Sequence, residues 1–397
     1  MHSAFSPSAP PRASGSTGCS PDSGADCSRS EPARLHERTT PPCLDPESRR
    51  RALALSLLPR VGIATYHQLV ARFGSASHAF DATGNGGERT AALRFADEIL
   101  ARAARSGARL LLAGDDDYPA SLSDLDHIGG PDRPLSPPVL FAIGKAGLLR
   151  STIVAIVGTR RATTYGERVT ADLAAALARA GATIVSGMAR GIDAAAHGAA
   201  LSCSGGQTIA VLGTGVDVAY PTAHAALRKR IASAGLLLSE ELPGDRANGG
   251  SFPRRNRIIA ALADVTIVTQ APERSGALIT ARYAMELGRA VAAVPGPIDA
   301  PQSAGSNCLL RDGAYAIAGI DDALGLIHAA APTRAAPAFD NANERAVWDA
   351  LAHGPADVDT LTARARLPAR ECLAAITALE MRGAVSCALD GEVRRIS

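Results

Sequence analysis

Short apolar segments that alternate with segments of helical spacing restrict the fold of this chain more than any other feature. The apolar segments are TIVAIVG (152–158), ATIVSG (182–187), TIAVLG (208–213), GLLLSE (235–240), DVTIVTQ (264–270) and AVAAVPG (290–296). Stretches such as GERVTADLAAALARAG (166–181) separate them. Continuous apolar strands that alternate with helices are typical of a parallel sheet covered by helices on both faces. We therefore predict a doubly wound, Rossmann-like α/β domain over residues 113–328.

The rest of the chain divides by composition and periodicity. The first residues are rich in Ser, Pro, Gly and Ala and bury too little apolar surface to fold. Residues 113–150 are rich in turns and prolines and are interpreted as a connector into the sheet. Near the end, three helical stretches precede a predicted hairpin turn at Asp390-Gly391. The parts predicted in this way are a disordered tail (1–44), a small helical domain (45–112), a linker (329–341) and a winged-helix domain (342–397).

Charge and cysteine content narrow the functional classes. The net charge is only +2, so any basic surface must be local. Of the 41 basic residues only Lys145 and Lys229 are lysine, and the planar guanidinium groups of the others suit phosphate. The seven cysteines include no C-x-x-C pair, which predicts reduced thiols in a cytoplasmic protein. No apolar run approaches the ~20 residues of a membrane span, and the N-terminus lacks a signal-peptide pattern. We predict a cytoplasmic protein without membrane contact.

The loops that follow the predicted strands contain glycines, hydroxyl groups and arginines. In an open parallel sheet, ligands bind at the carboxyl ends of the strands, and a helix N-terminus there attracts anions. Glycines let the backbone approach a ligand, and Asp193 is predicted to cap the helix that it begins. Each loop alone is equally well explained as turn and cap chemistry. Together they predict a site for a polyanion, with these candidates: Gly158, Arg160, Gly187, Gly191, Ser275, Gly276 and the cluster Arg254, Arg255 and Arg257.

No catalytic set is evident in the sequence. LGTGVDVA (212–219) lacks the third glycine of a dinucleotide fingerprint, and Pro221 delays the next helix, so a nicotinamide cofactor is not predicted. Ser186 has no G-x-S-x-G context, and His197 is interpreted as a packed or capping histidine. Paired carboxylates and metal-ligand spacing are also missing from the sequence. We therefore predict a protein that is not an enzyme, with no catalytic residue, cofactor or metal.

Five blocks of the sequence, in order, resemble the DNA-processing protein A (DprA or Smf) family. The blocks are VGTRRATTYG (157–166), SGMARGIDAAAHGAAL (186–201), FPRRNRIIAAL (252–262), SGALITARYAMELGR (275–289) and VPGPIDAPQSAGSNCLLRDGA (294–314). The resemblance implies an extended Rossmann domain that binds single-stranded DNA, protects incoming DNA and loads the RecA recombinase during natural transformation. It also implies a homodimer formed through the Rossmann domain. The helical domain and the winged-helix tail fit the same layout.

The resemblance also implies roles for individual residues. Arg160 would be the main phosphate contact of its loop, and Gly187 and Gly191 would offer backbone N–H groups. The arginine cluster would lie beside the ligand edge of the sheet and face the DNA backbone, and Arg160 and Arg255 are both predicted on exposed loops. Tyr220 would either stack on a base, since aromatic faces accept any base, or pack against Pro221. The implied DNA-binding residues are Gly158, Arg160, Arg161, Gly187, Arg190, Gly191, Tyr220, Arg254, Arg255, Arg257, Ser275 and Gly276, and the loop-organising residues are Asp193, Asn256 and Thr280.

The sequence departs from the family pattern at two places. Ala277 stands where many relatives have serine, which puts the role of that loop in doubt. LPRVGIATYHQLV (58–70) resembles a helix-hairpin-helix with Arg60 in place of the first glycine, so a structural role is favoured over a second DNA site.

The main alternative function is a Rossmann-type nucleotide-processing hydrolase, which would need a carboxylate beside a Pro-Gly-Gly-x-Gly-Thr loop. A transcription factor is disfavoured because the predicted groove helix (368–382) is neutral, and protein binding is expected there instead.

Overall fold

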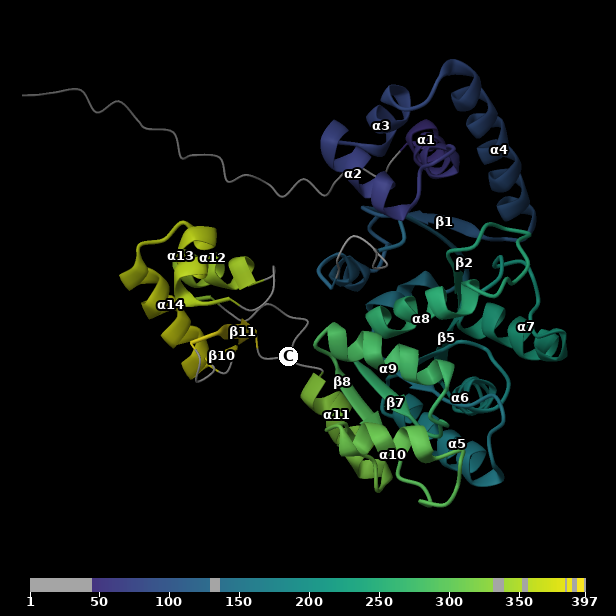
Figure 1. Ribbon diagram of the computed structural model, residues 1–397, viewed down its shortest axis with the longest axis vertical. Helices are drawn as coiled ribbons and strands as arrows, with labels where there is room; N and C mark the ends of the chain where they lie inside the picture. The colour runs from purple at the N-terminus through teal and green to yellow at the C-terminus, as the bar shows by residue number, and fades with distance from the viewer. Residues whose placement is uncertain are drawn as a thin grey trace, which may run out of the picture. The chain divides into compact units, whose positions relative to one another are not determined.

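The computed structural model describes residues 45–128, 136–330, 339–351, 356–382, 384–387 and 391–395 (Figure 1). The predicted disordered tail (1–44), most of the predicted linker (329–341) and Asp390 of the predicted turn lie outside these residues.

A nine-stranded, mostly parallel sheet forms the centre of the protein and confirms the predicted α/β fold. Strands β4, β5 and β6 follow one another on one side of β3, and β7, β8 and β9 follow one another on its other side. The chain therefore changes direction between β3 and β7, and such a switch point is where open α/β sheets bind ligands. The strands, in spatial order, are β1 (Arg109–Leu112), β2 (Val139–Gly144), β6 (Leu236–Ser239), β5 (Gln207–Leu212), β4 (Thr183–Ser186), β3 (Ile153–Val157), β7 (Val265–Val268), β8 (Ala290–Ala293) and β9 (Tyr315–Ala316).

Strand β9, which has only two residues, was not predicted, and neither were strands β1 and β2. They pair antiparallel with each other, and β2 pairs antiparallel with β6, so they extend one edge of the sheet. Strand β1 lies inside the segment assigned to the helical domain, and β2 lies inside the segment interpreted as a connector. Both interpretations were wrong in this respect. Both strands contain short apolar runs, but proline-rich and turn-rich sequence surrounds β2 and follows β1, and that segment was interpreted as a connector.

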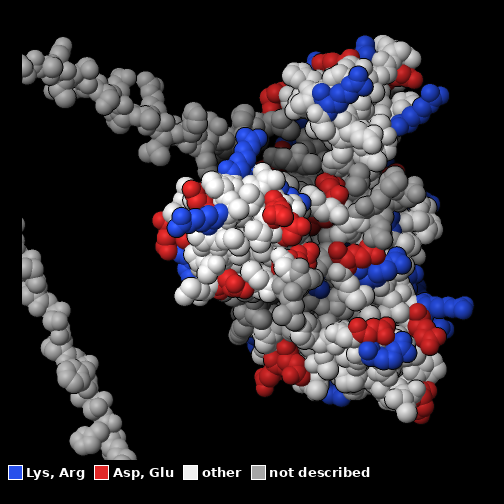
Figure 2. Space-filling view, turned by 60° about the vertical axis from the view of Figure 1, so that its left-hand side comes forward, with Lys and Arg blue, Asp and Glu red and all other residues white. Residues whose placement is uncertain are grey.

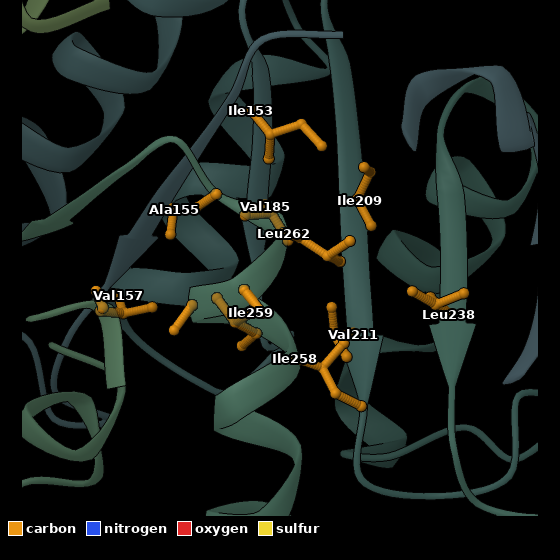
Figure 3. Packing of buried hydrophobic residues seen from close by; sticks show 14 of the residues in the cluster. Ile153, Ala155, Val157, Val185, Ile209, Val211, Leu238, Ile258, Ile259 and Leu262 are labelled. Atoms are coloured by element: carbon orange, nitrogen blue, oxygen red, sulfur yellow. The ribbon is translucent and has the colours of Figure 1, made fainter. Parts of the chain in front are cut away.

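Helices cover both faces of the sheet, as the continuous apolar strands predicted. Because side chains alternate across a strand, Ala155 and Val157 of β3 face one layer, whereas Val154 and Ile156 face the other. On the first face, Ile258, Ile259 and Leu262 pack against the strands (Figure 3). The helices of this domain are α5 (Thr164–Arg179), α6 (Ile192–Ala200), α7 (Ala225–Ala234), α8 (Ser251–Leu262), α9 (Gly276–Glu286), α10 (Ala304–Arg311) and α11 (Ile320–Ala330).

The predicted N-terminal helical domain is present. Its helices are α1 (Pro46–Leu57), α2 (Ile63–Phe73), α3 (Ala76–Ala82) and α4 (Gly86–Arg105). Asp45 caps α1 and is followed by a proline at the first helical position, and Asn85 and Glu88 form a capping box on α4. Buried residues of these helices share one apolar cluster with Val139, Phe141 and other residues of the sheet. The cluster joins this domain to the sheet.

The tail contains the three helices and the hairpin expected for a winged helix. They are α12 (Ala342–Ala350), α13 (Val358–Ala365) and α14 (Ala369–Met381), followed by the antiparallel strands β10 (Val385–Cys387) and β11 (Val393–Arg395). Trp348 lies in its core, and the guanidinium of Arg395 covers the indole at 4.2 Å. Arg382, just after α14, pairs with Asp340 and Glu344 and so adds no free positive charge to that helix.

Charges are mixed on the surface. On the face shown in Figure 2, basic and acidic side chains are interspersed over the described residues. This agrees with the small net charge of +2 and means that a site for an anion must be a local feature. No helix in the described ranges has the length and apolarity that crossing a membrane requires.

Candidate functional site

Two adjoining pockets lie at the carboxyl ends of the parallel strands. One lies between β3 and β7, where the chain changes direction, and the other lies beside it at the ends of β4 and β5. Their volumes are about 460 and 430 Å³, and both are lined by Arg160, Ala189, Phe252 and Arg255. Because they share these residues, we treat them as one groove. The loops after β3, β4, β5 and β7 and the first turn of α8 form its walls, so the predicted loops do meet at one edge of the sheet.

Four arginines with exposed side chains line this groove: Arg160 and Arg161 after β3, Arg190 after β4, and Arg274 after β7. Within the described part of the chain none of them forms an ion pair. Cations that no neighbouring carboxylate neutralises attract an anionic ligand. The sequence prediction omitted Arg274, although it stands directly before the helix start at Ser275, where an anion is expected.

An aromatic pair stands in the wall of the groove. The rings of Tyr220 and Phe252 are 5.4 Å apart between centroids, and Tyr220 is 44% exposed. The guanidinium carbon of Arg160 lies 5.1 Å from the Phe252 centroid, within cation–π range. A Cβ atom at Gly213 would lie 2.9 Å from the Phe252 ring, so only glycine lets this ring pack as it does. Sequence analysis missed Phe252, and the available signal was an aromatic residue beside an arginine cluster in a chain with 4% aromatic residues.

Arg255 is buried, and the prediction of an exposed loop position was wrong for it. The segment is helical from Ser251, and Arg255 shares the inward face of α8 with Ile258, Ile259 and Leu262. Only 6% of Arg255 is exposed. Its guanidinium donates to the carbonyl of Gly187 at 2.8 Å and to that of Val211, which joins the ends of β4 and β5. Burial lowers the pKa of Arg255 to about 10, with the charge of Arg160 contributing and that of Asp193 opposing.

The other two arginines of the cluster do not line the groove. Arg257 is fully buried and donates two hydrogen bonds to Glu240, at 2.8 and 2.9 Å. Arg254 pairs with Glu241 at 2.5 Å and lines a different pocket of about 240 Å³. The three side chains diverge because residues on a helix turn by about 100° each. Arg257 is therefore too buried to face DNA, contrary to the prediction. Arg254 is half-exposed outside the groove, and its contact with DNA remains a prediction.

The pocket that contains Arg254 is also lined by residues of the helix-hairpin-helix segment. Arg60 has φ of 68°, in the left-handed region that favours glycine, so the hairpin keeps its expected backbone without its first glycine. Gly62 of the hairpin lines the pocket beside Glu240, Glu241 and Asp245. Carboxylates at this position repel phosphate, which favours the structural role predicted for the hairpin.

Asp193 organises the loop after β4, but it does not cap the helix as predicted. Residue Gly191 is the N-cap of α6 and supplies no side chain. The carboxylate of Asp193 instead accepts hydrogen bonds from the N–H groups of Gly187, at 3.1 Å, and Ala189, at 3.2 Å. Burial raises the pKa of Asp193. The prediction that the Gly187 N–H is free for a ligand is therefore wrong.

The glycines at this edge allow close packing. A Cβ at Gly187 would collide with the Arg255 guanidinium, and one at Gly158 would lie 2.5 Å from Ile192. Gly191 has φ of 72°, and a Cβ there would lie 2.5 Å from the carbonyl oxygen of Thr159. Packing thus accounts for these three glycines. A contact with a ligand at Gly158 or Gly191 remains a prediction.

The start of α9 closes the other end of the groove. The Ser275 hydroxyl caps α9 by accepting from the N–H of Ala277 at 3.3 Å. The side-chain amide of Asn256 donates to the carbonyl of Gly276 at 3.0 Å and so ties α8 to this loop. Thr280 is buried and lines the groove from α9. No Cβ contact restricts Gly276, so space remains there for a ligand.

His197 is packed in the core, as interpreted from the sequence. It is fully buried, and its Nδ1 lies 2.7 Å from the Thr208 hydroxyl. That hydroxyl donates to the carbonyl of Ile184 at 2.6 Å, so Nδ1 carries the proton and donates to Thr208. Burial, with a smaller effect of Arg255 and His224, lowers the pKa of His197 to about 3.

This pKa predicts a loss of stability in mild acid. The unfolded chain takes up a proton at residue 197 below pH 6.5, whereas the folded chain does so only near pH 3. The unfolded state therefore binds more protons in this window, and stability falls as pH falls through it, by about 1.4 kcal/mol at pH 5.5. Urea unfolding at pH 7.5 and 5.5 measures the effect, and His197→Asn should remove it. The separate pH dependence that comes from the raised pKa of Asp193 should stay the same. Equal pH dependence in both proteins would show that His197 is not neutral and buried.

Comparisons with known proteins agree with this architecture. The family described as DNA recombination-mediator protein A matches residues 109–328. A DprA-like N-terminal HHH domain matches residues 46–102, and a DprA winged helix domain matches residues 330–391. A putative DNA processing protein DprA from Mycobacterium tuberculosis is 42% identical over 296 residues, which cover 71% of this chain and 76% of that protein. The X-ray structure of DNA processing protein A from Streptococcus pneumoniae is 32% identical with a TM-score of 0.57, covering 70% of this chain and 95% of that one.

Proposed function

The chain belongs to the DNA recombination-mediator protein A family, and on that premise we propose that its groove binds single-stranded DNA. One observation carries the proposal: four exposed arginines and an aromatic pair line the same groove at the switch point of the sheet. Arginines bind the backbone phosphates, and aromatic rings stack with bases of any sequence. The binding should therefore show little sequence preference.

The two halves of the groove suit different parts of a nucleotide. The half beside Tyr220 and Phe252 also contains apolar Met188 and Leu212, and it suits a base. The half beside Arg274 contains the capped start of α9 and the polar Thr280, and it suits a phosphate. Arg160 lines both halves and can bind a phosphate while it covers Phe252. We propose the exposed groove arginines, Tyr220, Phe252 and the Ser275–Gly276 turn as the DNA contacts, and Asp193, Asn256 and Thr280 as the residues that shape the groove.

Single-stranded DNA should bind at least about tenfold more tightly than a duplex of the same length, since a free strand can turn a base onto the aromatic pair. In a duplex the bases are paired and stacked, and only the phosphates reach the arginines. Competition between labelled single strands and unlabelled duplex at 150 mM salt measures the preference. Equal or tighter binding of duplex would contradict the proposed groove.

Further roles follow from family membership. We propose that the protein protects incoming single strands, loads RecA on them in natural transformation, forms a homodimer through the Rossmann domain and acts in the cytoplasm. We also propose that the winged helix binds protein, because the arginine after α14 is paired within the tail.

We propose no enzymatic activity. A nucleotide-processing hydrolase needs a carboxylate free to act beside the phosphates. Among the residues that line the groove the one carboxylate is Asp193, which is buried and accepts hydrogen bonds from two backbone N–H groups on one of its oxygens. No feature of the described residues favours the hydrolase alternative.

A further inference from the structure

The two rings of the aromatic pair come from separate loops that lie against each other. Tyr220 belongs to the loop after β5, residues 213–221, and Phe252 follows the loop after β6, residues 240–250. The Gly215 N–H donates to the carbonyl of Asp245 at 2.9 Å, and the Gly244 N–H donates to the Asp217 carboxylate at 2.6 Å. The relative position of the loops therefore depends on these cross-links.

Asp217 also binds the N-terminal helical domain. Its second carboxylate oxygen accepts from Nε of Arg102, in the last turn of α4, at 2.9 Å. The Asp217 side chain is 14% exposed, so its charge is largely removed from water. The Arg102 guanidinium lies directly on Gly244, where any Cβ would collide with it and where φ is 97°. One carboxylate thus meets both loops and the helical domain.

We propose that Asp217 is a positioning residue that holds Tyr220 and Phe252 at stacking distance, and that Arg102 couples the helical domain to the groove through it. The effect on DNA rests on the proposed function. Neither Asp217 nor Arg102 lines the groove, so their influence on binding acts through the loops. Loss of the Asp217 contacts with Gly244 and Arg102 should weaken stacking on a base but leave the phosphate contacts of Arg160 and Arg274 intact.

An abasic oligonucleotide separates these two effects because it keeps the phosphates and lacks the bases. We expect Asp217→Ala to weaken binding of a normal single strand by about tenfold and to leave binding of the abasic strand unchanged. Arg102→Ala should give a smaller loss of the same kind, and Asp217→Asn, which keeps an acceptor for the Gly244 N–H, should lose less than Asp217→Ala. Arg105→Ala, an exposed arginine in the same turn of α4, is the matched control. Equal losses on both oligonucleotides, or no loss, would overturn the proposal.

Hydrogen exchange tests the positioning role without DNA. Exchange of residues 213–221 and 240–250 should rise together in Asp217→Ala and Arg102→Ala and stay unchanged in Arg105→Ala. Unchanged exchange in the first two variants would overturn the proposal even if DNA binds. If the unaltered protein fails to bind single-stranded DNA, the proposed function fails, and the exchange result still decides whether Asp217 ties the loops.

Discussion

Arg255→Ala is expected to lower the free energy of unfolding by about 3 kcal/mol. The substitution leaves the buried carbonyls of Gly187 and Val211 without their donor, and each unsatisfied buried group costs roughly 1–3 kcal/mol. It also leaves a cavity where the long side chain crosses the inward face of α8. Part of this loss is offset because a buried charge no longer has to be desolvated. Urea unfolding at pH 7.5 measures the change.

Arg254→Ala is the matched control, because the same type of side chain lies one residue earlier on the same helix. Arg254 is half-exposed, whereas the side chains of its ion-pair partners Glu240 and Glu241 are 13% and 11% exposed. Partly exposed ion pairs contribute less than the contacts of a fully buried guanidinium, so Arg254→Ala is expected to lower stability less than Arg255→Ala does. Similar stability of the two variants would show that Arg255 is not the clamp between β4 and β5 that its contacts indicate.

The arginine cluster shows what sequence can and cannot predict here. Three guanidinium groups within four residues indicate a special site, and one of them, Arg255, does line the groove. Which way each side chain points depends on where the helix begins. Arg255 was predicted on an exposed loop, but α8 begins at Ser251 and turns Arg255 toward the strands. The spacing of the arginines does not tell where the helix begins, so it does not tell which of them faces the strands.

The sheet was predictable because six of its strands, β3 to β8, are short apolar runs that alternate with helical segments. Strands β1 and β2 also contain apolar runs, but a turn-rich and proline-rich segment separates them instead of a helical one. The antiparallel pairing of β2 with β6, which lies far along the chain, could not be predicted from the sequence. The loops at the carboxyl edge were likewise predictable from strand order. Phe252 was missed because its partner Tyr220 lies far away in the sequence. Arg274 was missed because only the capping residues after it, Ser275 and Gly276, were considered at the start of α9.

Phe252→Ala is expected to weaken single-strand binding by about 5- to 150-fold, the equivalent of the ~1–3 kcal/mol contributed by stacking one base. The ring carries no charge, so the dependence of affinity on salt should not change. Phe252 is only partly buried, and its removal should disturb the fold less than that of Arg255. Fluorescence anisotropy with a labelled oligonucleotide measures the loss, and thermal melting of the variant checks that it is folded. Affinity within a factor of two of the original protein would remove Phe252 from the DNA contacts.

The salt dependence of single-strand affinity for Arg160→Ala tests the DNA groove most directly. If Arg160 neutralises one phosphate, the slope of log K against log salt should become shallower by about 0.7. Arg179→Ala, at the opposite end of α5 and outside the groove, should keep the original slope, and Phe252→Ala should give a parallel line at lower affinity. A slope that Arg160→Ala leaves unchanged, in a protein that still folds and still binds the strand, would contradict a phosphate contact at the switch point of the sheet.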